Sequence, residues 1–313
     1  MTTEMSMTTE MSMDIHEHYQ KYGYAIVHNF VPEPLIENVL ASYEKDIVQS
    51  QRPFFRQSTY SYSKNELNEF GYVKESFLDI HDYHKHPEFS YRVREILCSS
   101  KIQDVLKQLF GDDSFNLVQS MLFDANTNTF PHQEWWYLDT VPNGNLIIAW
   151  IALEDIDGRA GRFYVLPQTP DNLDFHSDQP GISHGEWATR IKTYVEAHQN
   201  QIQAPALKQG DVLFLNSRTI HGSLPTIDPQ FSRKSITAHY IPSAYGFGNV
   251  FKQKSITYKT YNNIRCYGAH PEYSVLNQLN FKLNRFLRGF PALSSIRQAK
   301  AALSGKLKSL NLQ

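Results

Sequence analysis

The middle of the chain is a series of short apolar or alternating runs that turn residues separate. Alternation with a period of two indicates strands, and many short strands between turns are typical of sandwiches and barrels. No helical pattern interrupts the runs between residues 115 and 166, so a jelly-roll barrel fits better than an alternating α/β sheet. The strands that we predict are 116–124, 134–139, 146–153, 162–166, 211–216 and 235–242. Together they predict a β core over residues 115–245.

Helical patterns precede this β core and provide it with a helical cover. A short helix is predicted to end at Gly23, and residues 24–30 then alternate like a strand. Pro32 and Pro34 open a second helix, because proline fits the first turn of a helix. Apolar positions three and four apart predict a third, amphipathic helix over residues 90–110. The fold class that we expect is therefore mostly β with helical cover.

The remaining segments set the expected domain boundaries. Residues 168–203 interrupt the β core as a partly helical insertion, and such long insertions often form lids or binding loops. Residues 1–13 contain a polar, methionine-rich near-duplication, for which we expect a disordered leader. We expect a single domain over residues 14–270 and a separate helical segment over residues 271–313.

The last segment is basic and amphipathic. After Glu272 the chain has no further acidic residue, whereas seven Lys or Arg residues follow. Leucine and phenylalanine side chains recur there at steps of three and four, which places them in one apolar stripe of a helix. The residues of this stripe are Leu276, Leu279, Leu283, Phe286, Leu287 and Phe290. We expect the stripe to pack on the barrel or across a homodimer, and binding to a membrane surface or another partner is the alternative.

Composition and charge exclude several classes of protein. Hydrophobic residues make up 41% of the 313 residues, which is typical of a globular protein. Thirty basic residues against 32 acidic ones give a net charge of −2, so no overall field attracts nucleic acid. The longest apolar run has eight residues, far fewer than a membrane span needs. Only two cysteines are present, which is typical of the reducing cytoplasm, where we expect the protein.

A candidate metal site lies in the β core. His132 and Glu134 begin a predicted strand, on which positions two apart point to the same face. His221 follows a later predicted strand, and Arg233 opens the last one. Two imidazoles and one carboxylate can form the facial triad that holds Fe(II) and leaves three coordination positions open. The guanidinium of Arg233 would bind one carboxylate of a dicarboxylic cosubstrate.

Other histidines of the chain offer competing assignments. His184 and Glu186 repeat the same pattern inside the insertion, but they lie too close to His221 for strands to separate the two halves of a triad. His84 and His86 would share one face of a strand, although their surroundings predict a polar loop. Three protein ligands would also suit a zinc hydrolase, or a metal-binding jelly roll without oxygenase activity.

In their order and spacing these motifs resemble the phytanoyl-CoA dioxygenase family. The segments that carry the resemblance are 132–139 (HQEWWYLD), 150–155 (WIALED), 221–225 (HGSLP) and Arg233, together with an opening over 23–27 and 34–36. The resemblance covers residues 14–245. It implies a double-stranded β-helix, which is a jelly-roll or cupin-like core, and an oxygenase that uses Fe(II), 2-oxoglutarate and O₂ on a small-molecule substrate.

The resemblance also implies roles for the residues of the candidate metal site. His132, Glu134 and His221 would be the iron ligands, and Arg233 would bind the distal carboxylate of 2-oxoglutarate. Glu134 departs from the family pattern, which has aspartate there, so the ligand geometry must absorb one extra methylene. Related halogenases lack this carboxylate and admit chloride to the iron, so its presence favours hydroxylation.

Further roles follow from the same resemblance. Trp150 and Ser223 occupy positions that line the cosubstrate in relatives, and Gln119 would face the pocket from the preceding strand. The candidates for contact with the substrate are Trp135, Tyr137 and Asp139.

The substrate is implied only by resemblance. The chain resembles cyanobacterial members of the family that tailor secondary metabolites, including toxins. The expected reaction is hydroxylation of 7-deoxycylindrospermopsin to cylindrospermopsin, with succinate and CO₂ as co-products. An acyl-CoA or an amino acid is the alternative substrate, although a CoA would require a basic rim for its phosphates, which the pocket segments do not show.

Overall fold

The computed structural model describes residues 14–57, 59, 61–167, 183–249, 252–253, 258–268, 274–276, 278–279 and 282–283. The predicted leader lies outside the described residues, as do the first part of the insertion and most of the basic C-terminal segment. No helix among the described residues is long and apolar enough to cross a membrane.

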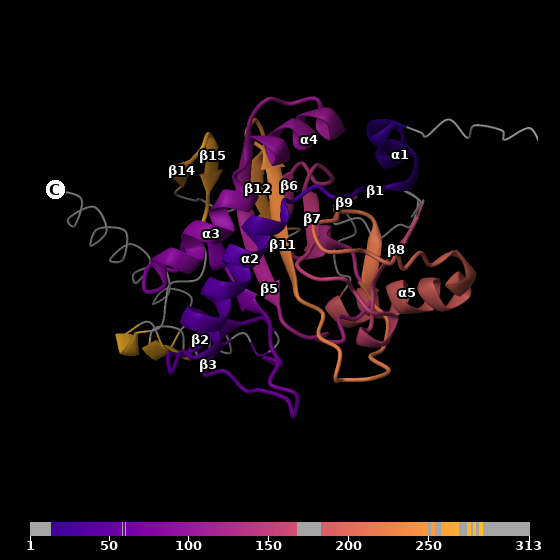
Figure 1. The fold of residues 1–313 in the computed structure, drawn as a ribbon. Helices are drawn as coiled ribbons and strands as arrows, with labels where there is room; N and C mark the ends of the chain where they lie inside the picture. The colour runs from indigo at the N-terminus through magenta and orange to yellow at the C-terminus, as the bar shows by residue number, and fades with distance from the viewer. Residues whose placement is uncertain are drawn as a thin grey trace, which may run out of the picture.

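A large, mainly antiparallel sheet forms one wall of the core (Figure 1). Its strands are β1 (Tyr24–Val27), β2 (Phe54–Arg56), β3 (Ser61–Ser63), β4 (Phe77–Leu78), β5 (Phe115–Phe123), β7 (Ile147–Ala152), β9 (Val212–Asn216), β11 (Ser235–Pro242), β14 (Lys259–Tyr261) and β15 (Ile264–Cys266). The strand order is β1-β9-β7-β11-β5-β4-β2-β3, and β15 pairs in parallel with β5 and antiparallel with β14. Strands that are distant in sequence are therefore neighbours in the sheet, as in a jelly roll.

A smaller sheet forms the opposite wall. It contains β8 (Phe163–Leu166) and β10 (Ile220–Ser223), and isolated bridges extend it through His132 beside β10 and Gln203 beside β8. A third sheet joins β6 (Asp139–Val141), β12 (Gly246–Asn249) and β13 (Lys252–Gln253). Apolar side chains of both walls meet in one cluster, which includes Trp150 and Val165. The predicted mostly β, double-stranded β-helix core is confirmed.

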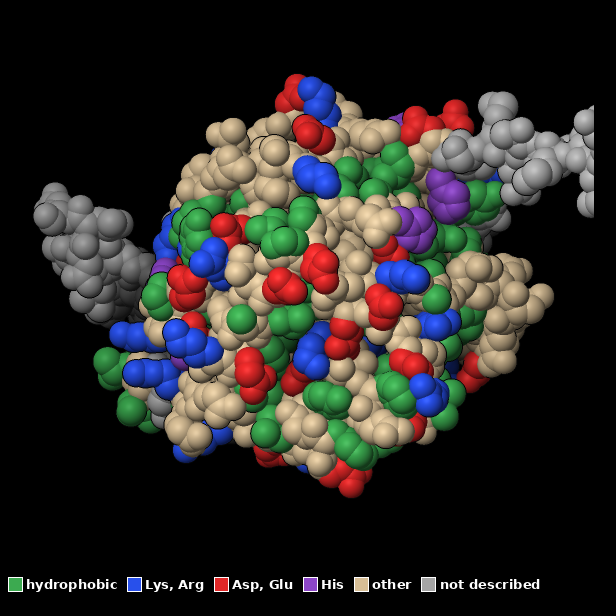
Figure 2. Space-filling model, in the orientation of Figure 1, with side chains coloured by type: hydrophobic (Ala, Val, Ile, Leu, Met, Phe, Trp, Pro, Cys, Tyr) green, Lys and Arg blue, Asp and Glu red, His purple; other side chains and the backbone are tan. Residues whose placement is uncertain are grey.

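Five α-helices precede the C-terminal segment in the described part of the chain, and most of them cover the outer face of the large sheet. They are α1 (Ile15–Tyr22), α2 (Glu33–Ser42), α3 (Pro87–Leu97), α4 (Ser100–Phe110) and α5 (His184–Ala197). The alternation along β7 explains this arrangement, because Ile147 and Ile151 join the cluster that α2 and α3 fill, whereas Ile148 and Trp150 point to the smaller sheet. On the face shown in Figure 2, acidic and basic side chains are interspersed rather than segregated.

The structure corrects two elements predicted from the sequence. The helix predicted over residues 90–110 is two helices, α3 and α4, because the Ser99 side chain accepts a hydrogen bond from the Ile102 amide at 3.3 Å and so caps a new helix. The strand predicted over residues 134–139 is also wrong. Its first part is the 3₁₀ helix η3 (Glu134–Trp136), and β6 begins only at Asp139.

The described part of the C-terminal segment is helical and exposed. Leu276, Leu279 and Leu283 are 72%, 58% and 45% exposed. For these three residues the structure therefore does not show the expected packing on the barrel. The rest of the apolar stripe lies outside the described residues, and the homodimer stays a prediction.

Candidate metal centre

One carboxylate and two imidazoles from distant parts of the chain meet between the two walls of the core. The ligand atoms of His132, Glu134 and His221 all lie within 4.8 Å of one another, and all three residues are buried. The Oε2 atom of Glu134 is 3.5 Å from Nε2 of His132 and 3.7 Å from Nε2 of His221. Among the residues that the structure describes, no other group of three metal-binding side chains converges in this way.

The backbone brings the two histidines together. His132 and His221 form an isolated antiparallel bridge, in which each amide donates to the other residue's carbonyl at 3.0 Å. Directly opposed residues of an antiparallel pair project their side chains on the same side. The rings accordingly lie 4.3 Å apart. The smaller sheet therefore sets the spacing of these two ligands.

Hydrogen bonds to backbone carbonyl groups determine which nitrogen of each imidazole ring faces Glu134. Nδ1 of His132 is 2.9 Å from the carbonyl oxygen of Phe130, and Nδ1 of His221 is 2.9 Å from that of Thr219. A carbonyl oxygen only accepts, so each Nδ1 carries a proton, and Nε2 is the nitrogen whose lone pair becomes available when the ring is neutral. Both Nε2 atoms, which are the nitrogens that would bind a metal ion, face Glu134.

A turn rather than a strand positions Glu134. The Glu134 carbonyl accepts from the amides of Tyr137 and Leu138, which closes the η3 turn. Gln133 lies between the two candidate ligands and holds the turn, since its side chain donates to the Arg218 carbonyl and accepts from the Trp135 indole at 2.8 Å. The predicted convergence of His132 and Glu134 is therefore present, although its cause differs from the one predicted.

The charge on Glu134 is stabilised although the residue is buried. Burial alone would raise the pKa of its carboxyl group, but the imidazoles of His239, His132 and His221 hold that pKa well below its usual range. Burial, together with the charge of neighbouring His132, lowers the pKa of His221 from its ordinary value. The geometry thus favours a carboxylate beside a neutral imidazole, which is a metal-binding combination.

Arg233 lines the same cavity, whose volume is about 50 Å³. The side chain is buried, and burial lowers the pKa of Arg233 to about 10, so it is charged at neutral pH. Its Nη1 donates to the carbonyl of Gly161 at 3.4 Å, and its Nε has no hydrogen-bond partner. Among the described residues it has no acidic partner. A buried guanidinium with an unused donor is suited to an anionic ligand.

The other residues predicted to bind the cosubstrate are placed differently. Trp150 lines the cavity and stacks on Phe163 at 5.5 Å. Ser223 lies at the end of β10, where its hydroxyl is 3.4 Å from the carbonyl of Thr129. Gln119 is outside the cavity lining, and its amide contacts the sulfur of Met121. The roles of Ser223 and Gln119 stay predictions.

The residues predicted to contact the substrate are not among those that line the cavity. Trp135 and Tyr137 pack against Trp187 of α5, and the Tyr137 hydroxyl is 2.9 Å from Nε2 of His184. Asp139 is fully buried and accepts hydrogen bonds from Ser217 and from three backbone amides. The structure therefore does not bring Asp139 to the cavity, because its carboxylate organises a turn instead.

The competing histidines do not form metal sites among the described residues. Glu186 takes part in a capping box with Ser183 at the start of α5, so its carboxylate caps a helix. His84 is exposed and contacts Lys259 and Asp82. These positions leave the group at His132 as the candidate centre.

Sequence reasoning missed His239, which also lines the cavity. Its Nε2 is 3.7 Å from Oε1 of Glu134, and its Nδ1 is buried without a hydrogen-bond partner. A signal was present, because His239 follows Arg233 by six residues. Even separations along a strand place side chains on one face.

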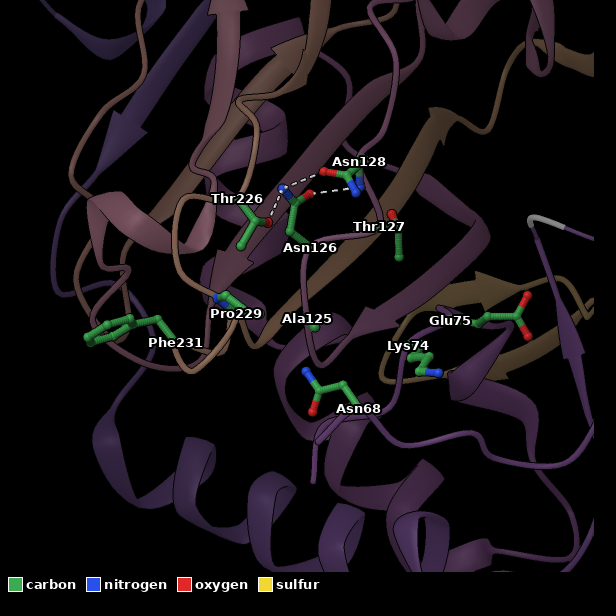
Figure 3. Close-up of a pocket in the computed structure, with 10 residues that line it drawn as sticks. All are labelled: Asn68, Lys74, Glu75, Ala125, Asn126, Thr127, Asn128, Thr226, Pro229 and Phe231. Atoms are coloured by element: carbon green, nitrogen blue, oxygen red, sulfur yellow. Dashed lines mark hydrogen bonds between the residues drawn. The ribbon is translucent and has the colours of Figure 1, made fainter. Parts of the chain in front are cut away.

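A second, larger cavity of about 360 Å³ lies beside the segment that leads from β5 to His132 (Figure 3). Its lining residues are Asn68, Lys74, Glu75, Ala125, Asn126, Thr127, Asn128, Thr226, Pro229 and Phe231. The Asn126 amide is bonded to Thr226 and to the carbonyl of Leu224, so it supports the wall. The volume is within the range of small-molecule pockets.

Comparison with known proteins identifies the family. The chain matches the family described as "Phytanoyl-CoA dioxygenase (PhyH)" over residues 19–235, which is more than half of its length. The chain belongs to the phytanoyl-CoA dioxygenase family. The predicted resemblance is thereby confirmed.

Two mammalian members of the phytanoyl-CoA dioxygenase family are distant relatives of this chain. The human peroxisomal phytanoyl-CoA dioxygenase is 23% identical over 249 residues, which cover 74% of this chain and 68% of the human protein. The bovine enzyme has the same identity and coverage.

Solved structures show the same fold. The epimerase SnoN, in complex with Fe³⁺, α-ketoglutarate and nogalamycin RO, is 17% identical, with a TM-score of 0.55 over 76% of this chain and 86% of its own. EctD from S. alaskensis, with 2-oxoglutarate and 5-hydroxyectoine, is 18% identical, with a TM-score of 0.52 over 79% of this chain and 81% of its own.

The residues present fit the cofactors of the family. Two imidazole nitrogens and a carboxylate oxygen form a donor set suited to Fe(II), and the unused Nε of buried Arg233 suits a dicarboxylate. As a member of the family, the chain is an iron- and 2-oxoglutarate-dependent dioxygenase.

Proposed function

We propose that this dioxygenase hydroxylates a small secondary metabolite. His132, Glu134 and His221 would hold Fe(II), and Arg233 would bind the distal carboxylate of 2-oxoglutarate. The observation that carries this proposal is the presence of a buried, charged Arg233 in the same cavity as the three candidate ligands. A plain metal-binding protein or a zinc hydrolase has no need of that arginine.

The charges in the cavity support this assignment. With neutral histidines, the negative charge of Glu134 and the positive charge of Arg233 cancel. A divalent metal ion then leaves two uncompensated positive charges in a buried space, which is unfavourable unless an anion neutralises them. The 2-oxoglutarate dianion carries the required charge.

The residues of the protein bind and orient the ligands and exclude water from the cavity. Iron and 2-oxoglutarate, when bound, supply the activation of O₂ that a C–H bond requires. The two histidines and Glu134 would hold the metal ion through three ligand atoms and would leave coordination positions for the cosubstrate and O₂. Phe123, Trp150 and Phe163 form apolar walls around these positions. Such walls protect the reacting groups from water and strengthen the charge interactions inside.

The substrate that we propose is 7-deoxycylindrospermopsin, which the enzyme would convert to cylindrospermopsin. Support for it comes only from the resemblance of the sequence to cyanobacterial tailoring enzymes. An acyl-CoA or an amino acid is the second candidate. The cavity lining at the metal centre includes only one basic side chain apart from histidine, that of Arg233, which offers little for the phosphates of a CoA.

The decisive experiment measures succinate release from 2-oxoglutarate with a panel of candidate substrates, under air and with Fe(II). We expect one substrate to stimulate succinate release and to gain one oxygen atom by mass spectrometry. The variant Glu134→Ala should abolish both signals. If zinc binds and 2-oxoglutarate is unchanged with every candidate, the proposal is wrong. A product without added oxygen would exclude hydroxylation while leaving the dioxygenase class intact.

A further inference from the structure

Three imidazoles, rather than two, surround the carboxylate of Glu134. Its Oε2 atom faces His132 and His221 at 3.5 and 3.7 Å, and its Oε1 atom faces Nε2 of His239 at 3.7 Å. His239 is not a member of the group whose ligand atoms all lie within 4.8 Å. The two oxygens of one carboxylate therefore have different partners.

We propose that His239 is a positioning residue for Glu134. It holds Oε1 away from the metal, so that Glu134 presents Oε2 as a single ligand atom. This inference rests on the proposed iron site. The separation of 3.7 Å in this structure is longer than a hydrogen bond, so the proposal requires the contact to be shorter in the metal-bound protein.

The glutamate explains why such a residue is needed. Aspartate, which the family usually has, is one methylene shorter and has one rotatable bond fewer. A longer carboxylate can turn and offer both oxygens to one metal ion, which would occupy a coordination position that ligands require. A fixed donor on Oε1 prevents this rotation.

The sheet holds His239 rigidly enough for that role. His239 lies on β11, which runs between β5 and β7. It pairs with Gln119 of β5 on one side and with Ile148 of β7 on the other. The pairing with β5 shifts register between His239 and Tyr240. Such irregularities are frequent beside active sites, where they redirect a side chain. His239 is also 2% exposed and faces the cavity.

The test measures metal affinity of the apoprotein, with Co²⁺ as an oxygen-stable probe and without 2-oxoglutarate. We expect His239→Leu to weaken Co²⁺ binding about 10- to 100-fold, which is the usual effect of losing a residue that orients a ligand. His239→Gln keeps an amide donor near the position of Nε2 and should stay within about threefold of the natural protein. If the leucine variant does not fold, His239→Asn replaces it, because its donor cannot reach Oε1.

A double-mutant cycle separates positioning from direct ligation. The shorter side chain of Glu134→Asp withdraws the carboxylate from His239, so adding His239→Leu should then change the Co²⁺ affinity less than about threefold. Equal effects in both backgrounds, or none in the natural background, would overturn the inference. Failure of the natural protein to bind metal would instead refute the proposed function.

Discussion

The substitution Arg233→Met should separate binding of the cosubstrate from binding of the metal ion. Methionine retains an unbranched apolar stem that can pack beside Phe123, whose ring lies 5.7 Å from the guanidinium carbon. Among the described residues that line the cavity, Arg233 is the only Lys or Arg, so the substitution removes this positive charge together with the unused Nε donor. We therefore expect the affinity for 2-oxoglutarate to fall, and the affinity for the metal ion to change little.

The structure sets the size of this effect. One Arg233 nitrogen is bonded to the Gly161 carbonyl, which leaves Nε and Nη2 for a fork of two bonds to a carboxylate. A hydrogen bond to a charged group contributes about 1.5–3 kcal/mol, so two contribute at least about 3 kcal/mol. Because about 1.4 kcal/mol corresponds to a factor of ten, the dissociation constant for 2-oxoglutarate should rise at least about 100-fold.

Anaerobic titration of the Fe(II) protein with 2-oxoglutarate, followed by its visible charge-transfer absorption, measures that constant directly. Arg233→Lys keeps the charge without the fork and should give an intermediate loss. Arg159→Met is the matched control, since Arg159 is half exposed and pairs with Asp157 outside the cavity. A loss below about tenfold, or an equal loss of metal affinity, would refute the assignment of Arg233.

Three further outcomes are expected. His221→Ala should weaken metal binding of the apoprotein more than about 100-fold, and an unchanged affinity in the same titration would exclude this residue as a ligand. Asp139→Ala should lower the free energy of unfolding by at least about 3 kcal/mol in urea denaturation, because it removes the acceptor of three buried donors and one part-buried donor; metal affinity in conditions where the variant is folded should not change. Cys98 and Cys266 should not react with a thiol reagent until the protein unfolds, because they are 2% and 3% exposed and because hydrogen bonding to Cys98, with burial, raises the pKa of Cys266. Stoichiometric labelling of the folded protein would contradict that expectation.

The strands were predictable wherever one periodicity dominated. Along β7 the side chains alternate between two apolar clusters, so the pattern in the sequence and the faces of the sheet coincide. Along β11 the apolar side chains of Ile236, Ala238 and Tyr240 face one cluster, and the positions between them face the cavity. The metal ligands were predictable for a different reason. Their spacing matched a family motif, and the β bridge between His132 and His221 explains why residues so far apart converge.

The rest of the metal centre could not be predicted from the sequence, because contacts between distant segments determine where its side chains lie. Trp136 stacks on Trp187 at 4.8 Å, so α5 of the insertion shapes the turn that carries Glu134, and no local pattern of residues 134–139 contains that information. Asp139 resembled an available carboxylate until the structure showed its amide partners. His239 lies within a predicted strand, and only the structure shows that its side chain faces Glu134.

The bridge between His132 and His221 has a consequence for the life of the enzyme in a cell. Because two backbone hydrogen bonds set the spacing of the histidines, the protein does not rely on the ion to gather them. We therefore expect the protein to keep its fold when iron is removed. The amount of available iron would then set the fraction of the folded protein that is active, and the metal-free fraction could bind iron again.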